Sequence, residues 1–180
     1  MKLWAALQQA WLGWVDIVRG REGWQTQFGF SVGALAKALV IFVLFAFLAI
    51  VVASIQTGMP SVPGLLTNLV VQGLGVLALV ISIVVTKLAV KSAIPVLVVL
   101  VPGVYGLVFY LVVGSILAAI SIETVAIALL GLVFLLYRLG RAAGNWTLGV
   151  SLAFSVLTVV LLVGMPLTLY MLGTPAAAST

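Results

Sequence analysis

The chain has 180 residues, of which 65% are apolar and only 6% are charged. Eight basic and three acidic side chains cannot cover a water-soluble fold of this length, in which about a quarter of the residues are normally charged. We therefore expect an all-α integral membrane protein. The sequence has no Cys and no His, which excludes disulfides, thiolate chemistry and the usual haem and zinc ligands. We expect no metal, no cofactor and no enzymatic activity.

The first element is a predicted amphipathic helix over residues 2–19, in which apolar side chains recur at intervals of three and four. The segment is too short and too polar to span a bilayer, and tryptophan prefers the headgroup region, so we expect the helix to lie flat on the cytoplasmic membrane surface. Its role is either a passive anchor or a wedge that responds to curvature or to a partner. The expected membrane-surface anchors are Trp4, Trp11, Trp14, Arg19 and Arg21.

Long uncharged intervals follow, and their lengths predict the membrane spans. Lys37 and Lys87 enclose 49 uncharged residues, which is enough for two helices, because one crossing takes about 20 residues. The same reasoning along the chain predicts five spans over 38–56, 64–86, 92–117, 122–137 and 148–172. We divide the chain into a surface helix and linker (1–29), a five-helix transmembrane domain (30–173) and a flexible tail (174–180).

The basic residues predict the orientation of these spans. All eight fall before or at the start of the first span, or in the connections that follow the second and fourth spans. Because cytoplasmic loops carry an excess of Lys and Arg, this distribution predicts a cytoplasmic N-terminus and a periplasmic C-terminus in a bacterial inner membrane.

Polar and small residues of the second expected span lie on one helical stripe that includes Asn68 and Gln72. One interpretation is a packing seam, in which small residues let helices approach and the amides form hydrogen bonds across the contact. The alternative is a pocket for a polar substrate or ion.

Glu123 is the one acidic residue in the span region. We expect Ser121 to cap a helix there, which places Glu123 in the first turn near the outer surface. The alternative is an intramembrane carboxylate that binds a proton or cation. We expect helix kinks at Pro102 and Pro166, because proline removes a backbone donor inside a helix. Such interruptions are typical of transporter sites, although they also occur in helices that transport nothing.

Three segments carry a resemblance to a known group: the Trp-bearing start, Gln27–Ser31 (QFGFS) and Tyr137–Thr147 (YRLGRAAGNWT). Together they resemble small five-span membrane proteins of alphaproteobacteria that are grouped with the Yip1-like fold. The resemblance implies five spans and a cytoplasmic N-terminus, but the Asp-Leu-Tyr-Gly-Pro type signature of eukaryotic Yip1 proteins is missing here, and no functional residue is carried over.

The sequence thus predicts a non-enzymatic membrane protein that acts through contacts with lipid or with other helices. It would work as a homo-oligomer or as an accessory subunit of a larger membrane complex, with no nucleic-acid partner. The alternative is a small transporter or channel, whose polar path would follow Asn68, Gln72, Glu123 and the Pro102 kink.

Overall fold

The computed structural model describes residues 2–58 and 60–173, and this part of the chain is helical without any strand. The tail expected at 174–180 lies outside the described residues. The elements in chain order are α1 (Lys2–Arg19), η1 (Trp24–Gln27), α2 (Val32–Thr57), α3 (Val62–Ala89), α4 (Val96–Ile120), η2 (Ile122–Thr124), α5 (Val125–Ala142) and α6 (Leu148–Gly173).

Five helices of the described chain, α2 to α6, are long and apolar enough to cross a membrane. The prediction of an all-α fold with five helices able to span a membrane is therefore confirmed. Helix α2 begins at Val32, six residues before the expected span, because the Ser31 hydroxyl accepts a hydrogen bond from the Ala34 N–H (3.2 Å) and caps the helix there. Helix α4 begins four residues late, at Val96, because Pro95 occupies its N-cap position.

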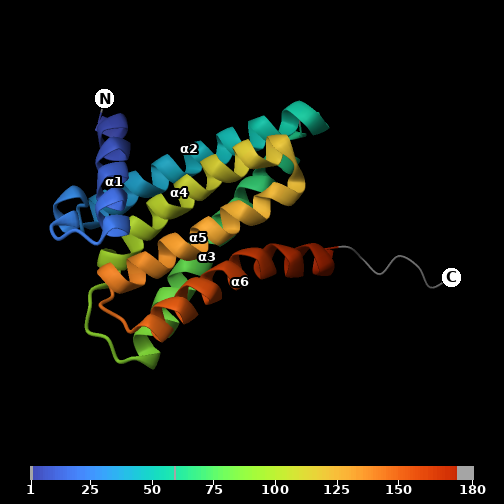
Figure 1. Ribbon diagram of the computed structural model, residues 1–180. Coiled ribbons are helices and arrows are strands. Elements are labelled where there is room, and N and C mark those ends of the chain that lie inside the picture. Colours follow the sequence, from blue (N-terminus) through green and yellow to red (C-terminus); the bar gives the residue numbers. More distant parts are fainter. Residues whose placement is uncertain (1, 59, 174–180) are drawn as a thin grey trace.

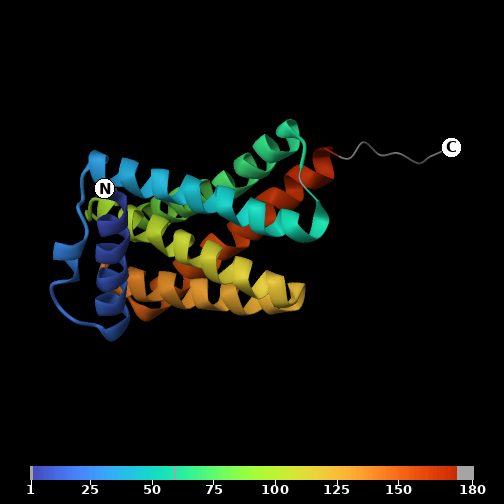
Figure 2. The same ribbon diagram turned by 90° about the horizontal axis from the view of Figure 1, so that it is seen from above.

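Helix α4 is the centre of the bundle. It packs on α2, α5, α3 and α1, while α6 lies between α5 and α3 (Figures 1 and 2). Every residue of α4 from Val99 to Val108 is buried. Two glycines permit this close packing, because a Cβ at Gly103 would lie 2.8 Å from Leu79 and one at Gly106 would lie 3.0 Å from Trp14.

The two ends of the bundle differ in charge. Because α2 to α6 alternate in direction (Figure 1), the start of α2, the α3–α4 connection and the α5–α6 connection share one end. We call this the basic end, and it carries Arg19, Arg21, Lys37, Lys87, Lys91, Arg138 and Arg141. The opposite end holds the α2–α3 and α4–α5 connections, with Glu123 in the second of these.

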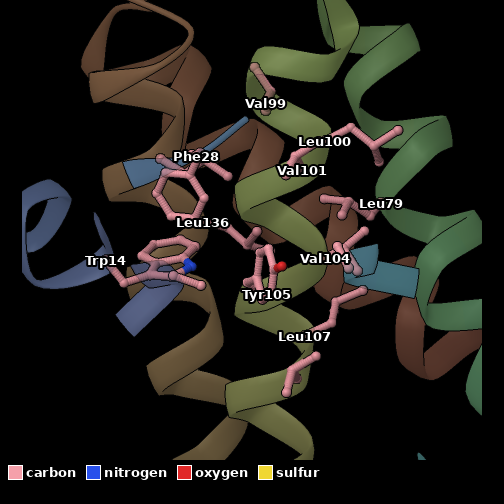
Figure 3. Close-up of a cluster of buried hydrophobic side chains, with 14 of the residues drawn as sticks. Trp14, Phe28, Leu79, Val99, Leu100, Val101, Val104, Tyr105, Leu107 and Leu136 are labelled. Carbon is pink, nitrogen blue, oxygen red and sulfur yellow. The ribbon is translucent and has the colours of Figure 1, made fainter. Parts of the chain in front are cut away.

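Helix α1 lies across the bundle at the basic end (Figures 1 and 2). Ala10, Trp14 and Ile17 form the buried face of its C-terminal half. The Trp14 Nε1–H donates a hydrogen bond to the carbonyl of Pro102 (3.1 Å), and its ring points toward Tyr105 and Leu136 (Figure 3). The expectation that Trp14 anchors the helix to the membrane surface is therefore wrong, since this side chain is inside the protein.

The outward face of α1 keeps the other two tryptophans. Trp4 is 66% exposed and Trp11 is 58% exposed. Trp11 also touches the bundle, because its ring lies edge-on to that of Phe109, with 5.6 Å between the centroids. The apolar stripe predicted from the sequence therefore contacts two different environments. One part of it packs on α4, and the other part faces outward.

The C-terminus of α1 is fixed by a turn and by a distant arginine. Gly20 adopts a left-handed conformation (φ 68°), which lets the N–H groups of Gly20 and Arg21 bond back to Ile17 and Asp16. Arg138 of α5 donates from Nη2 to the same Ile17 carbonyl (3.0 Å). A cation at this position also offsets the negative end of the α1 dipole.

The α5–α6 connection folds around Trp146, which is buried and packs edge-on against Phe154. The Arg141 side chain donates a hydrogen bond to the Trp146 carbonyl (2.7 Å), and the backbone N–H of Trp146 donates one to the Gly140 carbonyl (3.2 Å). Gly144 leaves room for the indole, because a Cβ there would lie 2.5 Å from Trp146 Cδ2. This connection is a closely packed turn at the basic end.

Candidate functional site

The polar stripe of α3 has two different environments along its length. Toward the basic end, Gly75, Ser82 and Thr86 are buried, and α3 packs on α6 there. A Cβ at Gly75 would meet the side chain of Leu162 at 3.6 Å. Toward the opposite end, Gln72 is half-buried and Asn68 is exposed. The stripe therefore changes at Gln72 from a packed seam to an open surface.

Two adjoining cavities meet at this point. One is about 250 Å³ and the other about 480 Å³, and both are lined by Gln72, Tyr110 and Leu111. We call them together the Gln72 cavity. Small side chains from α2 and α4 form much of its wall, namely Ala49, Ala53, Gly114, Ser115, Ala118 and Ala119.

The geometry of α2 and α3 accounts for the opening. Although these helices are consecutive, they pack against each other less extensively than α4 with α5 or α5 with α6. Helix α3 crosses α2 at an angle and does not run beside it (Figures 1 and 2). The small residues of α4 cannot fill the space between the crossing helices, so a cavity remains in the half of the bundle away from the basic end.

Two polar groups face this cavity at mid-depth. Gln72 lies ten residues from the start of α3 and Tyr110 ten residues from the end of α4, so each is about 15 Å from the end of its helix. Within residues 2–58 and 60–173, neither the Gln72 amide nor the Tyr110 hydroxyl makes a hydrogen bond. An amide without a partner at this depth is costly in hydrocarbon, so the cavity favours an occupant that offers a hydrogen bond.

The cavity does not continue to the basic end. Leu79 and Ile83 of α3 are fully buried there, beside the buried stretch of α4 from Val99 to Val108. Neither Leu79 nor Ile83 is among the residues that line the two cavities. The Gln72 cavity therefore lies in the half of the bundle away from the basic end.

The structure does not bring the expected path residues together. Asn68 is exposed outside the cavity, and Pro102 lies in the core. Glu123 is exposed in the α4–α5 connection, where its backbone N–H donates to the Ser121 hydroxyl (3.3 Å). Of these four expected path residues, only Gln72 lines the cavity, and Pro166 of α6, the second expected kink, lines it as well. Both prolines lie inside helices that continue through them.

Sequence reasoning missed Tyr110 and the small residues of α4. Gly114 and Ala118 are four residues apart, the small-xxx-small spacing of helix interfaces. In a chain with 18 glycines such pairs are frequent, so only the structure shows that this pair faces a cavity.

No cluster of three or more potential metal ligands occurs in the part of the chain that the structure describes. Comparison of the chain with protein-family models, with curated proteins and with solved structures finds no match. Function is therefore inferred from the geometry of the cavity and of the two bundle ends.

Proposed function

We propose that this chain is a non-enzymatic inner-membrane protein that acts by binding a transmembrane helix, either of a second copy or of a larger complex, in the Gln72 cavity. One observation carries the proposal: small residues of α2 and α4 face a cavity in which the Gln72 amide has no hydrogen-bond partner among the described residues. Small residues allow close approach of a helix backbone, and an interhelical amide hydrogen bond adds about 1 kcal/mol.

The proposed orientation places the basic end in the cytoplasm and the C-terminus in the periplasm. The positive-inside rule supports this orientation, because the basic residues of the bundle lie at one end. In this orientation the C-terminus of α1 lies at the cytoplasmic surface, whereas Trp11, which touches Phe109 of α4, lies deeper along the side of the bundle. The Gln72 cavity then opens in the outer half of the bilayer.

Transport is the less well supported function for the same residues. A path along Asn68, Gln72, Glu123 and Pro102 would need these side chains to line one passage, whereas only Gln72 lies in the cavity. The packed inner half would also have to open. We therefore favour binding over conduction.

Single-cysteine cross-linking in native membranes tests the proposal, because the chain has no native cysteine. Ala119→Cys places a thiol in the cavity wall, while Leu130→Cys on α5 places one on an exposed face away from it. A short photo-activatable thiol reagent should give a protein–protein product with Ala119→Cys and none with Leu130→Cys. A product of twice 18.8 kDa indicates a second copy, and any other mass indicates an accessory subunit.

Gln72→Leu, added to Ala119→Cys, replaces the amide by an apolar side chain of similar size. The association constant should fall about fivefold, which corresponds to about 1 kcal/mol. Asn68→Leu is the matched control, since this amide lies outside the cavity, and it should leave the cross-linking yield unchanged. Lipid adducts alone at both cysteine positions would show that the cavity meets only the bilayer.

A further inference from the structure

A second cavity, of about 610 Å³, lies at the basic end, away from the Gln72 cavity. Its walls come from the end of α1, the loop that follows it and the last turns of α5. We call it the arginine cavity, because Arg21, Arg138 and Arg141 all line it. From the sequence, Arg21 was expected to anchor the chain at the membrane surface, and Arg138 and Arg141 indicated only the orientation of the spans.

The three guanidinium groups retain most of their hydrogen-bond donors. Each guanidinium has five N–H donors. Arg138 donates one bond to the carbonyl of Ile17, and Arg141 donates one to that of Trp146. The Nε of Arg138 is buried and has no partner among the described residues. Several donors from two neighbouring turns of α5 therefore remain for a further acceptor.

The charges around the cavity are unbalanced. Three arginines and a single carboxylate, that of Glu22, line it. Asp16 lies nearby, but its Oδ1 is 3.7 Å from Nη1 of Arg21, and the Arg21 side chain is 61% exposed, so this pair offsets little of the charge. Like charges gathered in a concave site raise the local positive potential and attract anions.

We infer that the arginine cavity binds a phosphate group. Arginine presents its donors as a planar fork that matches phosphate oxygens in pairs. The cavity lies beside the C-terminal ends of α1 and α5, which in the proposed orientation face the cytoplasmic headgroup region, and basic pockets of this kind between transmembrane helices bind lipid headgroups. An anionic phospholipid and a soluble phosphate share the recognised group. The inference depends on the proposed orientation only for the choice between these two sources.

The bound phosphate would join two parts of the fold. Arg21 belongs to the loop after α1, whereas Arg138 and Arg141 belong to α5. An anion held by all three would fasten α1 to the bundle and would relieve the repulsion between the arginines. Binding of the phosphate group should therefore stabilise the contact between α1 and α5.

The test measures retained phospholipid by native mass spectrometry. The full chain is purified in mild detergent after reconstitution in an equimolar mixture of phosphatidylcholine and phosphatidylglycerol. The variant Arg21→Gln/Arg141→Gln removes two phosphate-binding groups but spares Arg138, which also caps α1. The variant Arg19→Gln/Lys37→Gln is the matched control, because it removes two exposed positive charges at the same end outside the cavity.

The wild type and the control should retain phosphatidylglycerol, and the cavity variant should retain at least tenfold less. If the double variant loses helix content by circular dichroism, Arg141→Gln alone replaces it, with an expected loss of about fivefold. A parallel arm supplies only phosphatidylcholine and adds inorganic phosphate. Phosphate binding in this arm that is lost only in the cavity variant supports the site and assigns it a soluble source. Equal retention by the cavity variant and the control, or no retention by the wild type in either arm, overturns the inference.

Discussion

The substitution Gly13→Ala should release α1 from the bundle even though it favours the helix itself. Alanine is better than glycine inside a helix by about 1 kcal/mol, so helix propensity alone predicts a more stable α1. In the folded protein, however, the new Cβ would overlap the ring of Phe28, with Cζ 2.8 Å away. The ring has little room to turn, because Trp24 and Tyr105 lie about 6 Å from it on other sides.

The expected loss of α1 docking free energy is the cost of this overlap minus the gain in helix propensity. Overpacking of a closed site costs about 1–3 kcal/mol, and the confined ring places Gly13 toward the upper part of that range. Subtracting the propensity gain leaves a net loss of about 2 kcal/mol in docking. A loss of this size corresponds to about a thirtyfold shift toward undocked α1.

Thiol labelling of Ala10→Cys measures this shift, because Ala10 lies on the docked face and is 1% exposed. Gly13→Ala should raise its labelling rate about thirtyfold, since labelling proceeds through local opening. Leu12→Cys, which is on the exposed face of the same helix, should label equally with and without Gly13→Ala. Adding Phe28→Ala should restore protection of Ala10→Cys by removing the overlap. An unchanged rate at Ala10→Cys in the Gly13→Ala protein would refute the packing argument.

Three further predictions concern the basic end and the topology. Arg138→Gln should lower the free energy of unfolding by about 1.5–3 kcal/mol in a detergent titration, because it removes a charged hydrogen bond to the last turn of α1; a loss below about 0.5 kcal/mol would contradict the capping role. Gly144→Ala should destabilise by about 1–3 kcal/mol through overlap with Trp146, whereas Gly131→Ala, with open space at its Cβ, should be neutral or slightly stabilising in the same titration. Reporter fusions at Gly58 and at the C-terminus should be active only in the periplasm, and a cytoplasmic C-terminus would rule out five spans.

The five long helices were predictable from the sequence because hydrocarbon imposes a length on every crossing. The starts of the helices were harder to predict. Lys37 served as a boundary in the sequence analysis, yet α2 begins at Val32 because Ser31 caps it and the lysine side chain is exposed. Charge marks where a membrane surface lies, whereas hydrogen bonding decides where a helix begins.

The environment of each α1 tryptophan could not be predicted from spacing. Trp11 and Trp14 both belong to the apolar stripe, but the bundle and the lipid are equally apolar, so hydrophobicity does not say which of them a side chain faces. The nearest clue was Gly13, whose missing side chain admits the Phe28 ring on the docked face. The resemblance to Yip1-like proteins stays a prediction, and it carried no information on this point.

The sequence predicted one residue of the Gln72 cavity but not the others. The sequence singled out Gln72 as a polar group in a span, and the alternatives of seam and pocket apply to different parts of the same stripe. Tyr110 and Gly114 could not be added, because their position depends on the angle at which α3 crosses α2. That angle comes from packing between helices far apart in the chain.

The bonds from α1 to residues 102 and 138 impose an order on assembly in the cell. Synthesis proceeds from the N-terminus at about 5–20 residues per second, so on the order of 10 s separates the emergence of Arg19 from that of Arg138. During this interval α1 has exposed tryptophans but no bundle to receive it. Helix α1 is thus made before the bundle but fixed only after α5 has emerged, and its early contacts must be with the membrane surface or with the insertion machinery.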